Sequence, residues 1–214
     1  MSIELSATDK AKFVKILAET DQIRLAHTER HCAFFATQNG GKILELLGVG
    51  VHKSLHKEAA LRGQDLGDFE YSVSSESLRE ALGPFALSDT LSKIIRPITL
   101  GPNEREAEIS PADKMKFIKV LAETDQIRFA STERNCYFFA TETGAKVLEL
   151  LGVGAHASLH AHGALRGYDF GEFTYSVSSE SLQQGTRRFA LSDTLRDVIK
   201  PIPQMPRTMD GRTA

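Results

Sequence analysis

Two pairs of histidines have the spacing that most directly suggests chemistry. Each pair reads His-x-x-x-His, with three residues between the two imidazoles. On an α-helix, residues four apart lie on one face about 6 Å apart, so two imidazoles can bind one divalent transition metal. The candidate metal ligands are His52, His56, His156 and His160. The spacing predicts one metal site in each half of the chain, provided that the segments carrying the pairs are helical.

The sequence does not single out the other ligands that such a site would need. A zinc peptidase of the HExxH type has a glutamate directly after the first histidine, but position 53 is Lys and position 157 is Ala, which excludes that class. Further ligands could come from three pairs of residues, none at a diagnostic spacing: Asp65/Asp169, Glu45/Glu149 and Cys32/Cys136. The alternative interpretation is that the histidines are ordinary residues bordering a buried helix stripe.

The two cysteines support a second hypothesis, a cysteine-based enzyme. Cys32 follows Arg30 and His31, which could supply an activating charge and a base, whereas Cys136 follows Asn135. Both cysteines precede apolar and aromatic residues. The alternative is therefore that each thiol packs in a strand as a small apolar side chain.

Arginines beside carboxylates and hydroxyls suggest a third hypothesis, a patch that recognises an anion or a partner. An arginine can bind a carboxylate or phosphate through two parallel hydrogen bonds. The candidate ligand-binding residues are Arg24, Arg30, Arg128 and Arg134. The same side chains could equally form helix caps and surface ion pairs. The sequence contains no P-loop, CxxC pair or GxSxG elbow.

These candidates occur twice because the chain contains a long internal repeat. Residue i matches residue i+104 without a gap from Ser6/Ser110 to Ile98/Ile202, and 61 of the 93 aligned positions are identical. We interpret the repeat as a tandem duplication with two modules, 6–98 and 110–202, a linker at 99–109 and a flexible tail at 203–214. Fused copies commonly imitate a symmetric homodimer, which predicts a pseudo-two-fold dimer.

The pattern within one module predicts an α+β fold. A serine N-cap followed by an apolar stripe predicts a helix over 7–19. Apolar segments at 32–37 and 42–49 flank Gln-Asn-Gly-Gly and predict a β-hairpin, and the alternative is one helix over 42–63, which Gly48 and Gly50 disfavour. The further expected elements are a helix over 51–62, a strand over 69–73, a helix over 75–82 and a helix from Ser88 to Pro97. Six consecutive differences between the copies, 79–84 against 183–188, predict an exposed loop.

Composition limits the classes of partner. The chain has 214 residues, 26 basic and 28 acidic side chains, and each module carries equal numbers of both charges, so we expect no nucleic-acid partner. Apolar runs are too short to span a bilayer, no secretory signal is visible, and only two cysteines are present, which predicts a cytoplasmic protein without a membrane partner.

The leading hypothesis is a non-enzymatic binding or regulatory protein with a small-molecule or protein partner. The alternatives are a metal-dependent protein and a cysteine-based enzyme. No cofactor is predicted apart from a divalent transition metal at the histidine pairs.

Overall fold

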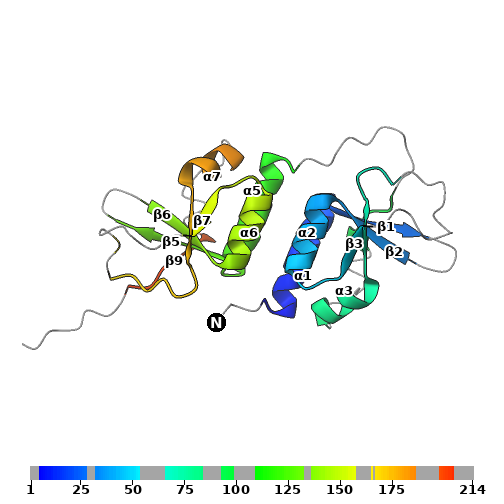
Figure 1. The fold of residues 1–214 in the computed structure, drawn as a ribbon, viewed down its shortest axis with the longest axis horizontal. Coiled ribbons are helices and arrows are strands. Elements are labelled where there is room, and N and C mark those ends of the chain that lie inside the picture. The colour runs from blue at the N-terminus through cyan, green and yellow to red at the C-terminus, as the bar shows by residue number, and fades with distance from the viewer. Residues whose placement is uncertain are drawn as a thin grey trace, which may run out of the picture. The chain divides into compact units, whose positions relative to one another are not determined.

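The computed structural model describes residues 5–27, 32–53, 66–83, 93–98, 109–132, 136–157, 165, 167–186 and 198–204. Contacts divide the chain into two units, one of residues 4–120 and one of residues 1–3 with 121–214. The division falls inside α5, a helix that spans Pro111–Glu123. Figure 1 shows helices and a sheet in both units, so the expected α+β class is confirmed.

The first unit contains a four-stranded antiparallel sheet with the strand order β1-β2-β4-β3. In chain order, its elements are α1 (Ala7–Glu19), β1 (Ile23–His27), β2 (Cys32–Ala36), α2 (Gln38–Leu46), β3 (Val51–Lys53), β4 (Tyr71–Val73) and α3 (Ser75–Leu82). The helix α2 contacts β2, β3 and β4, and α1 contacts α3.

The second sheet has the order β7-β8-β6-β5-β9, in which only the β5–β9 pair is parallel. After α5 come β5 (Ile127–Ser131), β6 (Cys136–Ala140), α6 (Glu142–Leu150), β7 (Ala155–Ala157), β8 (Tyr175–Val177), α7 (Ser179–Thr186) and β9 (Lys200–Pro201). Apart from β9, each element lies 104 residues after its counterpart. The first unit has an isolated parallel bridge, Leu25 with Pro97, at the position equivalent to β9.

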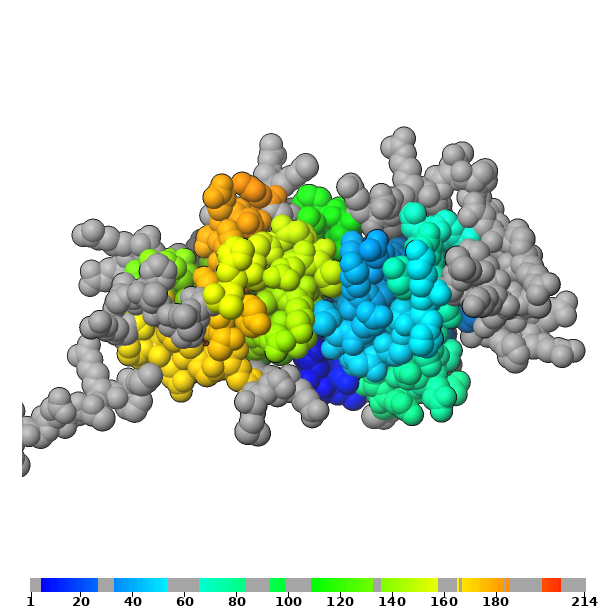
Figure 2. Space-filling model, in the orientation of Figure 1, coloured from blue at the N-terminus to red at the C-terminus, as the bar shows by residue number. Residues whose placement is uncertain are grey.

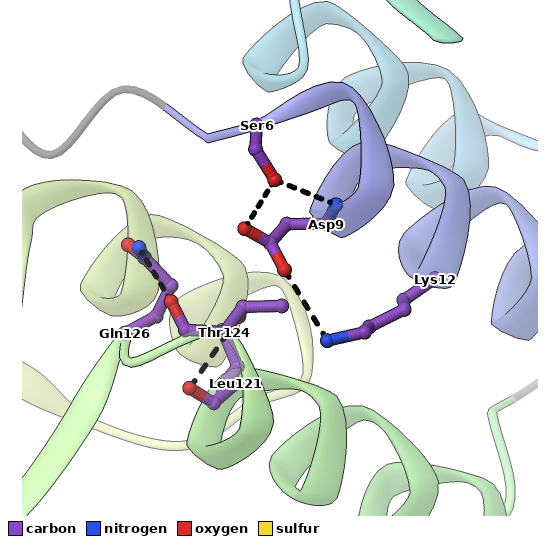
Figure 3. Close-up of polar contacts among 6 residues, drawn as sticks. All are labelled: Ser6, Asp9, Lys12, Leu121, Thr124 and Gln126. Carbon is purple, nitrogen blue, oxygen red and sulfur yellow. Dashed lines mark hydrogen bonds and ion pairs between the residues drawn. The ribbon is translucent and has the colours of Figure 1, made fainter. Parts of the chain in front are cut away.

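Local sequence accounts for α1, which confirms the helix expected over 7–19. The Ser6 hydroxyl accepts a hydrogen bond from the Asp9 backbone N–H (3.2 Å) and donates one to the Asp9 carboxylate (2.7 Å). Lys12 contacts the same carboxylate at 3.2 Å, as Figure 3 shows. The apolar stripe of the helix, which includes Phe13 and Leu17, is fully buried.

The register of the first sheet assigns alternate residues to opposite faces. Leu25, Phe34, Val73 and Val51 form one cross-strand row, and all four are buried. Tyr71 lies on the same face as Val73 because side chains alternate along a strand, and its ring packs close to Gly41 of α2. The face with Val73 and Tyr71 is therefore the one that α2 covers.

The opposite face of the sheet carries a second apolar cluster. Ala26 and Phe35 pack there with Leu66 and Phe69 from the segment before β4. The sheet is thus buried on both faces, by α2 on one side and by this segment on the other.

The hairpin expected from the segments 32–37 and 42–49 is wrong. The first segment is β2, but Gln-Asn-Gly-Gly forms the first turn of α2, and the Thr37 side chain caps it by accepting from the Gly40 N–H at 3.1 Å. Gly48, at φ 79°, follows Leu47, the C-cap residue of that helix. The alternative interpretation, one helix over 42–63, therefore predicted the correct element for residues 42–46. Gly48 and Gly50 correctly indicated that the helix does not continue through them.

Other boundaries also differ from expectation. Residues 51–53 form the strand β3 rather than the start of a helix over 51–62, and residues 54–62 lie outside the described residues. The helix expected over 75–82 is confirmed as α3. The exposed loop expected at 79–84 is wrong for residues 79–82, because they form the end of that helix and Leu82 is fully buried. Residues 93–94 are helical and Pro97 forms a bridge, whereas Ser88 lies outside the described residues.

A close backbone approach explains why Gly40 lies in the first turn of α2. A Cβ atom at this position would be 2.3 Å from the Gln22 carbonyl oxygen. The equivalent Cβ at Gly144 would be 2.3 Å from the Gln126 oxygen. Because the obstacle is backbone, a side chain here can be accommodated only if α2 moves away from the start of β1.

We expect Gly40→Ala to lower the free energy of unfolding by about 2 kcal/mol or more through this overpacking, measured by urea denaturation of the full chain. Gly41→Ala is the matched control, because the equivalent position already holds Ala145 in the same kind of helix. It should be close to neutral, since alanine is also a better helix former than glycine. Equal stability of the two variants would contradict the close-approach explanation.

Candidate functional site: a polar pocket in the first unit

A pocket of about 220 Å³ lies where the first turn of α2 meets one end of the sheet. It is lined by Gln22, Thr37, Gln38, Asn39, Lys53, Asp68, Glu70 and Tyr71. Every one of these side chains carries a hydrogen-bonding group. Figure 2 shows the surface of α2 beside that of the segment from residue 66 to β4, which together supply most of the lining.

The frame of the pocket is a buried polar pair, Gln22 and Thr37. The Thr37 hydroxyl donates to the Gln22 side-chain oxygen at 2.5 Å, and the Thr37 N–H donates to the Gln22 backbone oxygen at 3.1 Å. The Gln22 amide nitrogen donates to the Thr20 carbonyl at 3.4 Å. These contacts join the start of β1 to the start of α2.

The same frame occurs in the second unit. The Thr141 hydroxyl donates to the Gln126 side-chain oxygen, and the Gln126 amide nitrogen donates to the Thr124 carbonyl at 3.3 Å. Figure 3 shows the latter contact. The Thr141 N–H donates to the Gln126 backbone oxygen at 3.1 Å.

Charged side chains lie at the mouth of the pocket in the first unit. The Lys53 ammonium lies 3.1 Å from the Glu70 carboxylate, and this hydrogen bond raises the pKa of Lys53. Both side chains are more than half exposed, at 60% and 52%, so the pair adds little to stability. Asp68 is half-buried and supplies a second carboxylate.

The two units differ most clearly at this rim. Five of the eight lining positions hold different residues in the second half, whereas Gln22, Thr37 and Tyr71 are repeated. The replacements are Glu142, Thr143, Ala157, Glu172 and Thr174. Both partners of the Lys53–Glu70 ion pair are replaced together, by alanine and threonine. The frame is therefore common to the two units, and the rim chemistry is specific to each.

Two of the arginines expected to bind a ligand have partners within their own unit. The Arg24 Nε donates to Asp21 at 2.8 Å, its Nη2 contacts the other oxygen of that carboxylate, and its guanidinium lies 4.8 Å from the centre of the Phe69 ring. Arg24 is only 7% exposed. This arrangement positions the loop that leads into β1.

Arg128 repeats these contacts. It donates to Asp125 at 2.9 and 2.6 Å and lies 4.8 Å from the centre of the Phe173 ring. The hydrogen bond from Arg128 lowers the pKa of Asp125, and the same bond raises the pKa of Arg128. Arg30 and Arg134, the other two candidates, lie outside the described residues.

His52 does not line the pocket. His52 is exposed in β3 opposite Ser72, and His156 is exposed in β7 opposite Ser176. His56 and His160 lie outside the described residues. Because His52 is in a strand, the helical spacing that suggested a metal site does not apply to it. Among the described residues, no three His, Cys, Asp or Glu side chains gather as metal ligands would.

The sheet register also separates His52 from Arg24. Arg24, Phe35, Ser72 and His52 form one cross-strand row, with the arginine and the histidine in the two outer strands. Three strand spacings separate them by about 14 Å, so the structure does not bring these two candidate residues together. The row lies on the face opposite Tyr71 and Lys53.

The cysteines lie in strands, as the alternative interpretation expected. Cys32 begins β2 and Cys136 begins β6, where its side chain is half-buried. A reactive thiol remains a prediction.

None of the residues that line the pocket was among the predicted ligand-binding or metal-binding residues. One signal was available, because Lys53 and Glu70 change together between the copies, but the two residues are 17 positions apart and only the β3–β4 pairing makes them neighbours.

None of the helices in the described part of the chain combines the length and apolar character that a bilayer crossing requires. Comparison with protein-family models, curated proteins and solved structures finds no match for this chain. A functional hypothesis therefore depends on the geometry of the pocket.

Proposed function

We propose that this chain is a binding protein that holds a small polar molecule in the pocket of the first unit. The observation that supports the proposal is the contrast between the repeated Gln22–Thr37 frame and the changed rim. When a site is duplicated, its rim residues can change while its frame residues stay the same. The ligand preference of each copy can then differ without loss of the fold. A volume of about 220 Å³ is below the range of pockets for drug-sized ligands and favours a compact molecule.

Binding accounts for the lining better than nucleophilic catalysis does. The described residues that line the pocket include no histidine, cysteine or serine, so the lining has no Ser–His or Cys–His pair for nucleophilic catalysis. Amides, hydroxyls and carboxylates predominate instead, and such groups fix the orientation of a polar ligand through hydrogen bonds.

The variant Asn39→Phe should abolish binding, because the larger side chain would occupy the pocket while α2 remains intact. Asn39 is half-buried, and the equivalent helix position holds Thr143, so this site accepts substitution. The measurement is the change in ¹⁵N–¹H spectra of the full chain on adding pools of monosaccharides, amino acids, amines and dicarboxylates. We expect changes at the pocket residues in the unmodified chain and none in the variant.

The matched control is Thr143→Phe, which places the same bulk in the second unit and should leave binding in the first unit unchanged. If no pool perturbs the pocket residues, or if Asn39→Phe binds as the unmodified chain does, the pocket is not a ligand site.

We also propose that the two modules descend from a tandem duplication and associate as a pseudo-two-fold dimer. Identity at 61 of 93 aligned positions and the common element order support this proposal. Fragments 1–104 and 105–214, expressed separately, should each form a homodimer in which a second copy replaces the missing module. Light scattering coupled to size-exclusion chromatography measures this directly. Stable monomeric fragments would contradict the paired arrangement.

The alternative function is binding of a divalent transition metal by the histidine pairs, for which His52 and His156 are accessible at equivalent positions in strands rather than at a helical spacing. Equilibrium dialysis of the full chain against Zn²⁺ should then give stoichiometric metal by elemental analysis. The amount of bound metal per chain should decrease in the double variant His52→Ala/His56→Ala and in the double variant His156→Ala/His160→Ala. If the unmodified chain contains no more metal than the background level, this alternative function is wrong.

A further inference from the structure

We infer that the pocket in the first unit binds a neutral, polyhydroxylated small molecule, such as a monosaccharide or a sugar alcohol. This inference rests on the proposed binding function and names the class of ligand. It follows from the kinds of hydrogen-bonding groups that line the pocket and from the way their charges are paired.

The lining mixes donors and acceptors. Lys53 supplies an ammonium donor, Asp68 and Glu70 supply carboxylate acceptors, and the side-chain amides of Gln38 and Asn39 supply both. A ligand that displaces water from such a site must replace the hydrogen bonds that water made, or affinity is lost. A hydroxyl group both donates and accepts, so several hydroxyls on one small frame can satisfy neighbouring donors and acceptors together.

The Lys53–Glu70 ion pair disfavours a ligand that would compete for either of its two charges. The Lys53 ammonium and the Glu70 carboxylate already compensate each other at 3.1 Å. An anionic ligand that captured Lys53 would leave Glu70 without its cation, and it would also lie near Asp68. A diamine that captured Glu70 would in turn place its charge beside Lys53. Hydroxyls can bind to these groups without breaking the ion pair.

Apolar ligands fit the pocket poorly. Tyr71 is the only aromatic side chain among the described lining residues, and it is packed close to Gly41 of α2. Burying an apolar ligand against amides and carboxylates would remove their water without replacing its hydrogen bonds. The lining therefore selects against lipids and aromatic compounds.

The positions of the second unit that are equivalent to the changed pocket residues also carry mostly hydrogen-bonding side chains. Its equivalent positions hold Glu142, Thr143, Glu172 and Thr174, all with hydrogen-bonding side chains, and Ala157 in place of Lys53. Hydroxyl-binding groups are thus retained at four of the five changed positions, while the ion pair is lost.

The test is a titration of the full chain, followed in ¹⁵N–¹H spectra, with four classes of probe. The sugars are glucose, galactose, mannose and ribose, and the amines are putrescine and lysine. The anions are succinate and citrate, and the aromatic compound is indole. For a ligand of this size we expect a dissociation constant of about 1 mM for at least one sugar. Saturable changes should occur at the amides of the pocket residues.

Asp68→Ala should weaken sugar binding at least tenfold, because a carboxylate is a strong acceptor for hydroxyl groups. Asp68→Glu is the matched variant, since the equivalent position is Glu172, and it should retain measurable binding. Lys53→Ala/Glu70→Thr reproduces the residues of the second unit and should change the order of affinity among the four sugars. Well-dispersed spectra of each variant establish that it is folded.

The outcomes separate this inference from the proposed function. Tighter binding of putrescine, succinate or indole than of any sugar at the pocket residues would overturn the inference and leave the binding function standing. Sugar binding that Asp68→Ala does not weaken would also overturn it. If none of the four classes binds, both proposals fail.

Discussion

The close approach of α2 to the start of β1 is the constraint on which the pocket depends. Gly40 lies so near the Gln22 carbonyl that a Cβ atom would be 2.3 Å from it. This approach brings Thr37 into position to cap α2 and to donate to the Gln22 side chain. The first turn of the helix is thereby held at the end of the sheet, where the rim residues surround the pocket.

Burial explains why the frame is repeated and the rim is not. Gln22 and Thr37 are 1% and 6% exposed, so replacing either one would remove the hydrogen bond between their side chains from a buried site, at a cost of about 1–3 kcal/mol. Lys53 and Glu70 are largely exposed, and water can replace their mutual contact. The fold therefore tolerates changes at the rim, and the two units carry different chemistry on the same frame.

Strand alternation separates residues that are neighbours in sequence. His52 and Lys53 are adjacent in β3, but their side chains lie on opposite faces of the sheet. Lys53 lines the pocket, whereas His52 belongs to the row that ends at Arg24. Arg24 is engaged by Asp21 and Phe69, and neither Arg24 nor His52 lines the pocket.

The sequence by itself determined the elements whose causes are local: the Ser6-capped helix over 7–19, the helix over 75–82 and the repeat of 104 residues. Only the tertiary structure decided that Gln-Asn-Gly-Gly begins a helix and that residues 51–53 form a strand. It alone also placed Gln22, Thr37, Lys53 and Asp68 around one pocket. Glycines and apolar runs suit both a hairpin and a helix, and the deciding contacts join residues far apart in the chain. Such contacts depend on packing that no local pattern records.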